Sequence, residues 1–204
     1  MARKNPDLHG NAPDKNPIAL LIIDVINDLE FEGGDKLLKH AKSMAPKLAK
    51  LKQRAYAAGV PVIYVNDNFG MWRSDFAAQL RHCLEDGVRG EVIARALMPT
   101  QSDYFILKPK HSGFFATPLS ILLDHLQTKK LILTGIAGNN CVFFTANDAY
   151  LRDFEIVIPE DCVVSQSKAE NEAALTQMRE LVHASVLPSE KIRLKAGSPK
   201  TRKR

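Results

Sequence analysis

The chain has few cysteines and no long hydrophobic run. Its 204 residues include three cysteines, Cys83, Cys141 and Cys162, an odd number without paired spacing. This favours a reducing compartment, the cytoplasm, over a disulfide framework. No apolar run approaches the roughly 20 residues that span a bilayer, so we expect no membrane segment. The run 18–23 is short and lacks a small-residue cleavage site, which is typical of a strand rather than a signal peptide.

Acidic residues are missing from the end of the chain. Residues 191–204 contain only basic charges, and these exceed the net charge of +5 of the whole chain. The basic balance therefore belongs to a tail, and we predict that residues 196–204 are disordered. No aromatic residues are interleaved with these charges to stack on bases, which disfavours a nucleic-acid partner.

The sequence also lacks a histidine cluster and a dinucleotide-binding glycine motif. Gly33-Gly34-Asp35 does not have the spacing of a dinucleotide fingerprint. We therefore expect neither a metal nor another cofactor. The six histidines form no short-spaced ligand set; they are His9, His40, His82, His111, His125 and His183.

What the chain does contain is an alternation of strand and helix patterns. Its composition, 45% hydrophobic and 25% charged, is that of an ordinary globular domain. We predict an N-terminal arm (1–17), one domain (18–195) and the basic tail. The alternation predicts an α/β fold with a parallel sheet covered by helices on both faces. The expected strands are 18–25, 60–65, 104–107, 131–136 and 154–159, with a short sixth strand near 192–194. Pro46 is expected to break or kink the first helix.

Three polar residues follow strands that end at the same edge of the predicted sheet. Asp24 ends the first strand, Lys108 ends the third, and Cys141 follows the fourth. Active sites of parallel sheets lie at this edge. A cysteine at a helix start faces unpaired backbone N–H groups, which favour the thiolate and can hold an oxyanion. Lys108 can supply a positive charge, and Asp24 can accept the thiol proton.

Each of these residues also fits a structural role when taken alone. A buried cysteine that opens a core helix is common and inert. An aspartate at a strand end can cap a turn, and lysines are usually solvated. The shared edge weakens the structural interpretation of Asp24 and Lys108 but does not reverse it.

Three blocks of the sequence resemble the isochorismatase-like cysteine hydrolases, which include nicotinamidases and N-carbamoylsarcosine amidase. They are ALLIIDVINDL (19–29), KPKHSGFFATPL (108–119) and LTGIAGNNCV (133–142). The resemblance implies a three-layer α/β/α sandwich with a six-stranded, Rossmann-like parallel sheet, and a homo-oligomer, either a dimer or a tetramer. It also implies that Asp24, Lys108 and Cys141 form a catalytic triad.

The resemblance further implies a feature of the backbone next to the nucleophile. A non-proline cis peptide is expected between Ile136 and Ala137, with the N–H groups of Ala137 and Cys141 as the oxyanion hole. One departure is informative. Nicotinamidases of this family bind a metal through an aspartate and histidines after the second strand, but residues 66–73 contain no histidine. A metal-dependent nicotinamidase is therefore disfavoured.

Substrate contacts are predicted from aromatic and basic residues near the same edge. Phe31 and Phe114 are candidates for an apolar wall. Trp72 and Arg73 lie on the loop after the second strand, where aromatic packing and anion recognition both fit. Packing alone is an equal interpretation for each of them. His111 is expected to face solvent.

Together these observations predict a cofactor-independent hydrolase that cleaves a C–N bond of a small amide or ureide through a Cys141 thioester. Two alternatives stay open. One is an enol-ether hydrolase in which Asp24 supplies acid catalysis, and the other is a non-catalytic binding or scaffold protein. The substrate itself cannot be derived from the fold.

Overall fold

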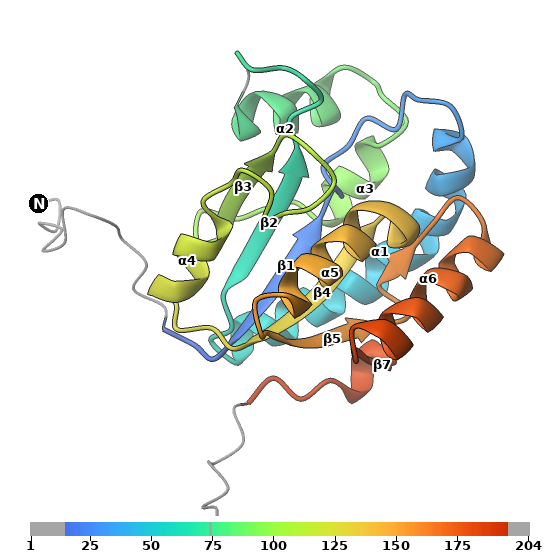
Figure 1. Ribbon diagram of the computed structural model, residues 1–204. Coiled ribbons are helices and arrows are strands. Elements are labelled where there is room, and N and C mark those ends of the chain that lie inside the picture. Colours follow the sequence, from blue (N-terminus) through green and yellow to red (C-terminus); the bar gives the residue numbers. More distant parts are fainter. Residues whose placement is uncertain (1–14, 74, 196–204) are drawn as a thin grey trace, which may run out of the picture.

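The computed structural model describes residues 15–73 and 75–195. It contains one sheet in the order β3-β2-β1-β4-β5-β7, with β6 paired to β4, and every pairing is parallel. This confirms the predicted fold (Figure 1). The strands are β1 (Ile18–Ile23), β2 (Val62–Asp67), β3 (Tyr104–Lys108), β4 (Lys130–Ile136), β5 (Glu155–Pro159), β6 (Val163–Val164) and β7 (Ser185–Leu187).

Helices cover both faces of the sheet. The apolar strand β1 is buried throughout, and its successive side chains enter two different cores. Leu20 and Ile22 pack towards α1, α2 and α3, whereas Leu21 and Ile23 pack towards α4, α5 and α6. A strand buried on both faces needs such an unbroken apolar run. The helices are α1 (Gly34–Ala57), α2 (Phe76–Glu85), α3 (Glu91–Ala96), α4 (Leu119–His125), α5 (Phe143–Tyr150) and α6 (Lys168–Leu181).

The break expected at Pro46 and the expected position of the last strand are wrong. Helix α1 continues through Pro46 without a break. Pro46 is exposed, so water can reach the carbonyl of Lys42 that loses its helical donor, while the buried face keeps its packing. The last strand is β7 (Ser185–Leu187) rather than 192–194, because Pro188 ends the pairing with β5 and a 3₁₀ turn follows.

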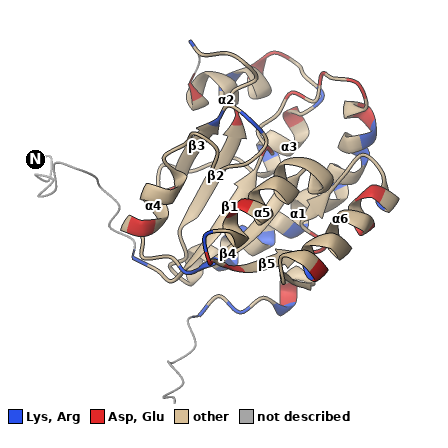
Figure 2. Ribbon diagram, in the orientation of Figure 1, with Lys and Arg blue, Asp and Glu red and all other residues tan. Residues whose placement is uncertain are grey.

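Charged side chains lie mainly on helices, loops and strand ends. In Figure 2 the strands are tan over most of their length, and acidic and basic residues are interspersed on the outer elements. Within the described part of the chain, no helix is long and apolar enough to cross a membrane. The predicted basic tail, and the predicted arm up to residue 14, lie outside the described residues.

The carboxyl ends of β1 and β4 approach each other closely. Gly135 lies opposite Ile23 in the register and has a φ of 110°. A Cβ atom at this position would lie 2.0 Å from the carbonyl oxygen of Ile23, so glycine is required. The close approach brings the residues that follow β1 and β4 side by side.

Candidate functional site

Asp24, Lys108 and Cys141 meet at the carboxyl edge of the sheet, as the strand pattern predicts. The Nζ atom of Lys108 lies 2.9 Å from Oδ2 of Asp24 and 3.4 Å from Sγ of Cys141. All three residues are buried, with exposed fractions of 4% for Asp24, 0% for Lys108 and 8% for Cys141. A buried ammonium therefore touches both the carboxylate and the thiol.

Local backbone geometry places each of these side chains. Asp24 leaves β1 with a φ of 51°, and its N–H donates to the carbonyl of Val65 at 3.0 Å. Lys108 is the last residue of β3. Cys141 lies in a single π-helical turn, Gly138–Val142, that leads directly into α5. The three side chains thus come from segments far apart in the sequence.

Asp67 is a second carboxylate of this cluster, which the sequence patterns did not reveal. Its Oδ2 lies 3.3 Å from Nζ of Lys108, and its N–H donates to Oδ1 of Asp24 at 2.6 Å. The signal was present, because Asp67 ends β2 at the same edge as Asp24 and Lys108. It was missed because the second strand was expected to end at residue 65.

The expectation that the helix start favours the Cys141 thiolate is wrong. Burial raises the pKa of Cys141, and the neighbouring Asp24 carboxylate raises this pKa further, while Lys108 opposes the change. The resting group is therefore a thiol. Burial also raises the pKa of Asp24, although Lys108 counteracts this. Burial alone would lower the pKa of Lys108, but the carboxylates of Asp24 and Asp67 raise it, so the ammonium stays charged.

A cavity of about 430 Å³ opens above these residues. The peptide bond between Ile136 and Ala137 is cis, as the sequence resemblance implies, and both residues lie on the cavity wall. Of the four predicted substrate contacts, only Phe31 lines this cavity. The lining residues are Asp24, Asn27, Phe31, Leu37, Asp67, Phe69, His111, Ile136, Ala137, Asn139, Asn140, Cys141 and Gln166.

The other three predicted substrate contacts lie elsewhere in this chain. Phe114 is buried in the core against Phe154, and the guanidinium of Arg152 lies 4.8 Å from the centre of its ring. Trp72 is 78% exposed and, with Arg73, borders a separate open depression. The ring of Phe114 is therefore part of the hydrophobic core, whereas Trp72 and Arg73 lie on an exposed loop.

His111 and several carboxamides reach the cavity without having been predicted to do so. His111 is exposed, as expected, but its Nδ1 lies 4.0 Å from Sγ of Cys141 and its ring stacks on Phe144. Asn27, Asn139, Asn140 and Gln166 add neutral donors and acceptors to the wall. Across residues 15–73 and 75–195, no three His, Cys, Asp or Glu side chains are grouped as metal ligands.

Replacing Asp24 with asparagine is expected to make Cys141 more reactive towards iodoacetamide at neutral pH, by about tenfold. The substitution removes the carboxylate that raises the pKa of the thiol and leaves Lys108 beside the sulfur. Alkylation should therefore rise with pH at a lower pH than in the unmodified protein. Time courses at several pH values, resolved by peptide mass spectrometry, measure this change.

Cys162 provides the internal reference for these time courses. It is fully buried, and burial raises its pKa to about 12. Its slow alkylation should be the same in both proteins. A Cys141 curve that is unchanged by Asp24→Asn, or moved to higher pH, would contradict the assigned charge coupling.

The chain is similar to known proteins over most of its length. The isochorismatase domain model matches residues 18–190. The chain is 44% identical over 174 residues to the uncharacterized isochorismatase family protein YaaI of Bacillus subtilis (strain 168), covering 85% of this chain and 95% of that protein. It is 28% identical to the ureidoacrylate amidohydrolase RutB of Cronobacter sakazakii, covering 74% and 75% of the two chains.

A solved structure shares the arrangement of elements. The nicotinamidase PncA of Bacillus subtilis superposes with a TM-score of 0.65 at 26% identity. The match covers 84% of this chain and 99% of that protein. The similarity therefore extends over most of this chain.

Proposed function

The chain belongs to the isochorismatase family of hydrolases, and from this premise we propose that it hydrolyses a C–N bond of a small amide or ureide through a thioester on Cys141. The observation that carries the proposal is the contact of one buried ammonium, that of Lys108, with both a carboxylate and a thiol. The carboxylate of Asp24 and the thiol of Cys141 belong to residues that line a cavity large enough for a small substrate.

In the first half of the proposed reaction, Asp24 acts as base and then as acid. The Cys141 thiol hydrogen-bonds to the Asp24 carboxylate, which takes the proton as sulfur attacks the carbonyl carbon. Backbone N–H groups of Ala137 and Cys141 stabilise the oxyanion that forms. The protonated Asp24 then gives its proton to the departing nitrogen, and the C–N bond breaks to leave a thioester.

In the second half, water replaces the amine. Asp24, again a carboxylate, takes a proton from water as the oxygen attacks the thioester carbonyl. The C–S bond breaks, the acid leaves, and the proton returns to sulfur. Lys108 stays protonated throughout and offsets the negative charge that moves between Asp24, sulfur and the substrate oxygen.

Two findings support an amide or ureide over other carbonyl compounds. The carboxamides on the cavity wall, Asn27, Asn139, Asn140 and Gln166, offer neutral donors and acceptors that match a small amide group. Relatives also carry amide-cleaving names, ureidoacrylate amidohydrolase and nicotinamidase. The raised pKa of Asp24 favours a second candidate, acid-catalysed cleavage of an enol ether, which needs no thiol.

Ammonia release from a panel of small primary amides and ureides tests the proposal. We expect at least one compound to release ammonia with the purified enzyme, and prior alkylation of Cys141 to abolish the release. Enol-ether hydrolysis that survives this alkylation but is lost in Asp24→Asn would select the second candidate. Release that is unaffected by alkylation, or no release from any amide or ureide, would contradict the thioester route.

A further inference from the structure

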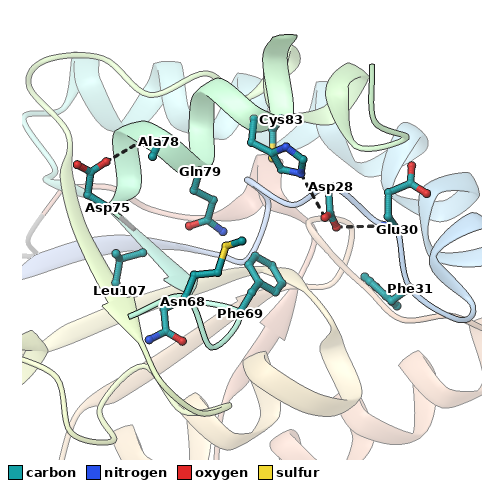
Figure 3. A pocket seen from close by; sticks show the side chains of 12 residues that line it. Asp28, Glu30, Phe31, Asn68, Phe69, Asp75, Ala78, Gln79, Cys83 and Leu107 are labelled. Atoms are coloured by element: carbon teal, nitrogen blue, oxygen red, sulfur yellow. Dashed lines mark hydrogen bonds and ion pairs between the residues drawn. The ribbon is translucent and has the colours of Figure 1, made fainter. Parts of the chain in front are cut away.

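A second cavity of about 410 Å³ lies beside the catalytic cavity, between the loop after β2, the loop after β1 and helix α2. Figure 3 shows Gln79 and Cys83 of α2 on one side of it, and Phe31, Phe69 and Asn68 on the other. No step of the proposed reaction uses it. The lining residues are Asp28, Glu30, Phe31, Asn68, Phe69, Met71, Asp75, Ala78, Gln79, His82, Cys83 and Leu107.

Two phenylalanines belong to the walls of both cavities. Phe31 and Phe69 line the catalytic cavity as well as the second one. Their exposed fractions, 40% and 45%, show that neither ring is packed into the core. The two cavities therefore share a partition of two aromatic rings, and a ligand bound on one side contacts the same rings as a ligand bound on the other.

The position of Phe69 is tied to the catalytic cluster. Its N–H donates to Oδ1 of Asp67 at 2.7 Å, and the other oxygen of Asp67 lies 3.3 Å from Nζ of Lys108. One carboxylate thus contacts both the backbone of Phe69 and the catalytic ammonium. This contact links the loop that carries Phe69 to the catalytic cluster.

The second cavity differs from the catalytic cavity in chemistry. Its exposed surface is mostly apolar, from Phe31, Phe69, Met71, Ala78, Cys83 and Leu107. Its acidic residues already have partners within the protein. Asp28 lies 3.4 Å from His82, Glu30 pairs with Arg89 at 3.3 Å, and Asp75 accepts the N–H of Ala78 at 2.7 Å. An apolar ligand group gains more here than a charged one.

We infer that the substrate has two parts: a carboxamide or ureide head in the catalytic cavity, and an apolar alkyl or aryl tail that passes Phe31 and Phe69 into the second cavity. The inference rests on the proposed function for the position of the head. The tail site itself depends only on the second cavity. The substrate class is therefore an amide or ureide with an apolar substituent, rather than the smallest members of either class.

Two neighbouring alanines of α2 provide a matched pair of variants. Ala78 lines the second cavity, whereas Ala77 is exposed and lines neither cavity. Ala78→Leu fills part of the tail site, and Ala77→Leu makes the same change one residue away on the solvent side. Both residues lie in the same helix, so an effect on the helix itself would be common to the two variants.

Equilibrium binding measures the tail site when every protein compared carries Cys141→Ser, so that neither amide is cleaved. The protein with the native α2 sequence is the unmodified one in this comparison. By titration calorimetry, N-benzylacetamide should bind the unmodified protein about tenfold or more tightly than acetamide. In Ala78→Leu the two amides should bind with nearly equal affinity. In Ala77→Leu the tighter binding of N-benzylacetamide should persist. Equal affinity for both amides in the unmodified protein, or equal losses in both variants, would overturn the inference.

Alkylation then connects the tail to the proposed nucleophile. N-benzyl iodoacetamide should alkylate Cys141 faster than iodoacetamide does, and Ala78→Leu should remove this advantage, as read by peptide mass spectrometry. Tail-dependent binding without preferential alkylation of Cys141 over Cys162 would leave the tail site standing and reject the proposed nucleophile. Preferential alkylation of Cys141 without tail dependence would support the proposed nucleophile and reject the tail site.

Discussion

Replacing Cys141 with serine is expected to reduce amide turnover by about 10⁴-fold or more. The substitution keeps the shape of the side chain and its hydrogen bond but replaces the thiol with a far weaker acid. Asp24 and Lys108 stay in place, yet the carboxylate cannot take a hydroxyl proton readily enough to sustain attack. Ammonia release on the best compound of the panel measures the loss.

A second thiol supplies the control for this loss. Cys162 is buried, has its sulfur near Asp161 and lines neither cavity. Cys162→Ala should therefore retain the turnover of the folded enzyme. Acid-quenched enzyme should also carry an acyl group on Cys141, visible as added mass on its peptide. Turnover by Cys141→Ser close to that of the unmodified enzyme would reject the thioester and favour acid catalysis by Asp24.

The fold could be predicted because each long strand is apolar on both faces. Strand β1, Ile18–Ile23, has no polar residue and can only be buried between two layers. The short strands β6 and β7 could not be predicted in the same way. They have two and three residues, too few for a periodic pattern, and their pairing with β4 and β5 decides their conformation.

In the candidate site too, residues at strand ends could be predicted from the sequence and residues in an irregular loop could not. Asp24, Lys108 and Cys141 follow strands that share an edge, so their meeting could be predicted from the strand pattern. His111 and Phe114 lie in an irregular loop after β3, where no periodicity tells which side chain faces the cavity and which enters the core. Tertiary packing decides this: His111 stacks on Phe144, and Phe114 packs on Phe154.

The protonation state of Cys141 could not be predicted from the sequence either. A cysteine near a helix start favours the thiolate when it is open to solvent and faces only backbone N–H groups. Here the sulfur is buried beside a carboxylate from a segment more than a hundred residues away, and both features raise the pKa of Cys141. The local motif predicted where the nucleophile lies, but its surroundings set its charge.

Replacing Lys108 with methionine is expected to lower the free energy of unfolding by about 3–5 kcal/mol at neutral pH and to abolish turnover. Methionine fills a similar volume, so the loss comes from charge. Asp24 and Asp67 would remain at the site without the ammonium that lies 2.9 Å and 3.3 Å from them. Urea denaturation followed by circular dichroism measures the stability.

The loss of unfolding free energy in Lys108→Met should depend on pH, and its direction follows from the direction in which the pKa of Asp24 changes. Burial raises the pKa of Asp24 and Lys108 opposes the rise, so the methionine variant raises this pKa further. A carboxyl group whose pKa is higher in the folded state destabilises that state as pH rises above the unfolded value near 3.9. The deficit of Lys108→Met should therefore be largest at neutral pH and shrink on acidification.

Two further variants separate charge from catalysis. Asp24→Asn in the Lys108→Met background removes one uncompensated carboxylate, so it should restore part of the stability while turnover stays absent. Lys52→Met removes a different buried ammonium, one that pairs with Asp103 at 3.2 Å and lines neither cavity. It should cost similar stability but leave the turnover of the folded enzyme intact. If the double variant were as unstable as Lys108→Met alone, lost packing rather than unpaired charge would explain the defect, and Lys108 would not be the group that keeps Asp24 ionised.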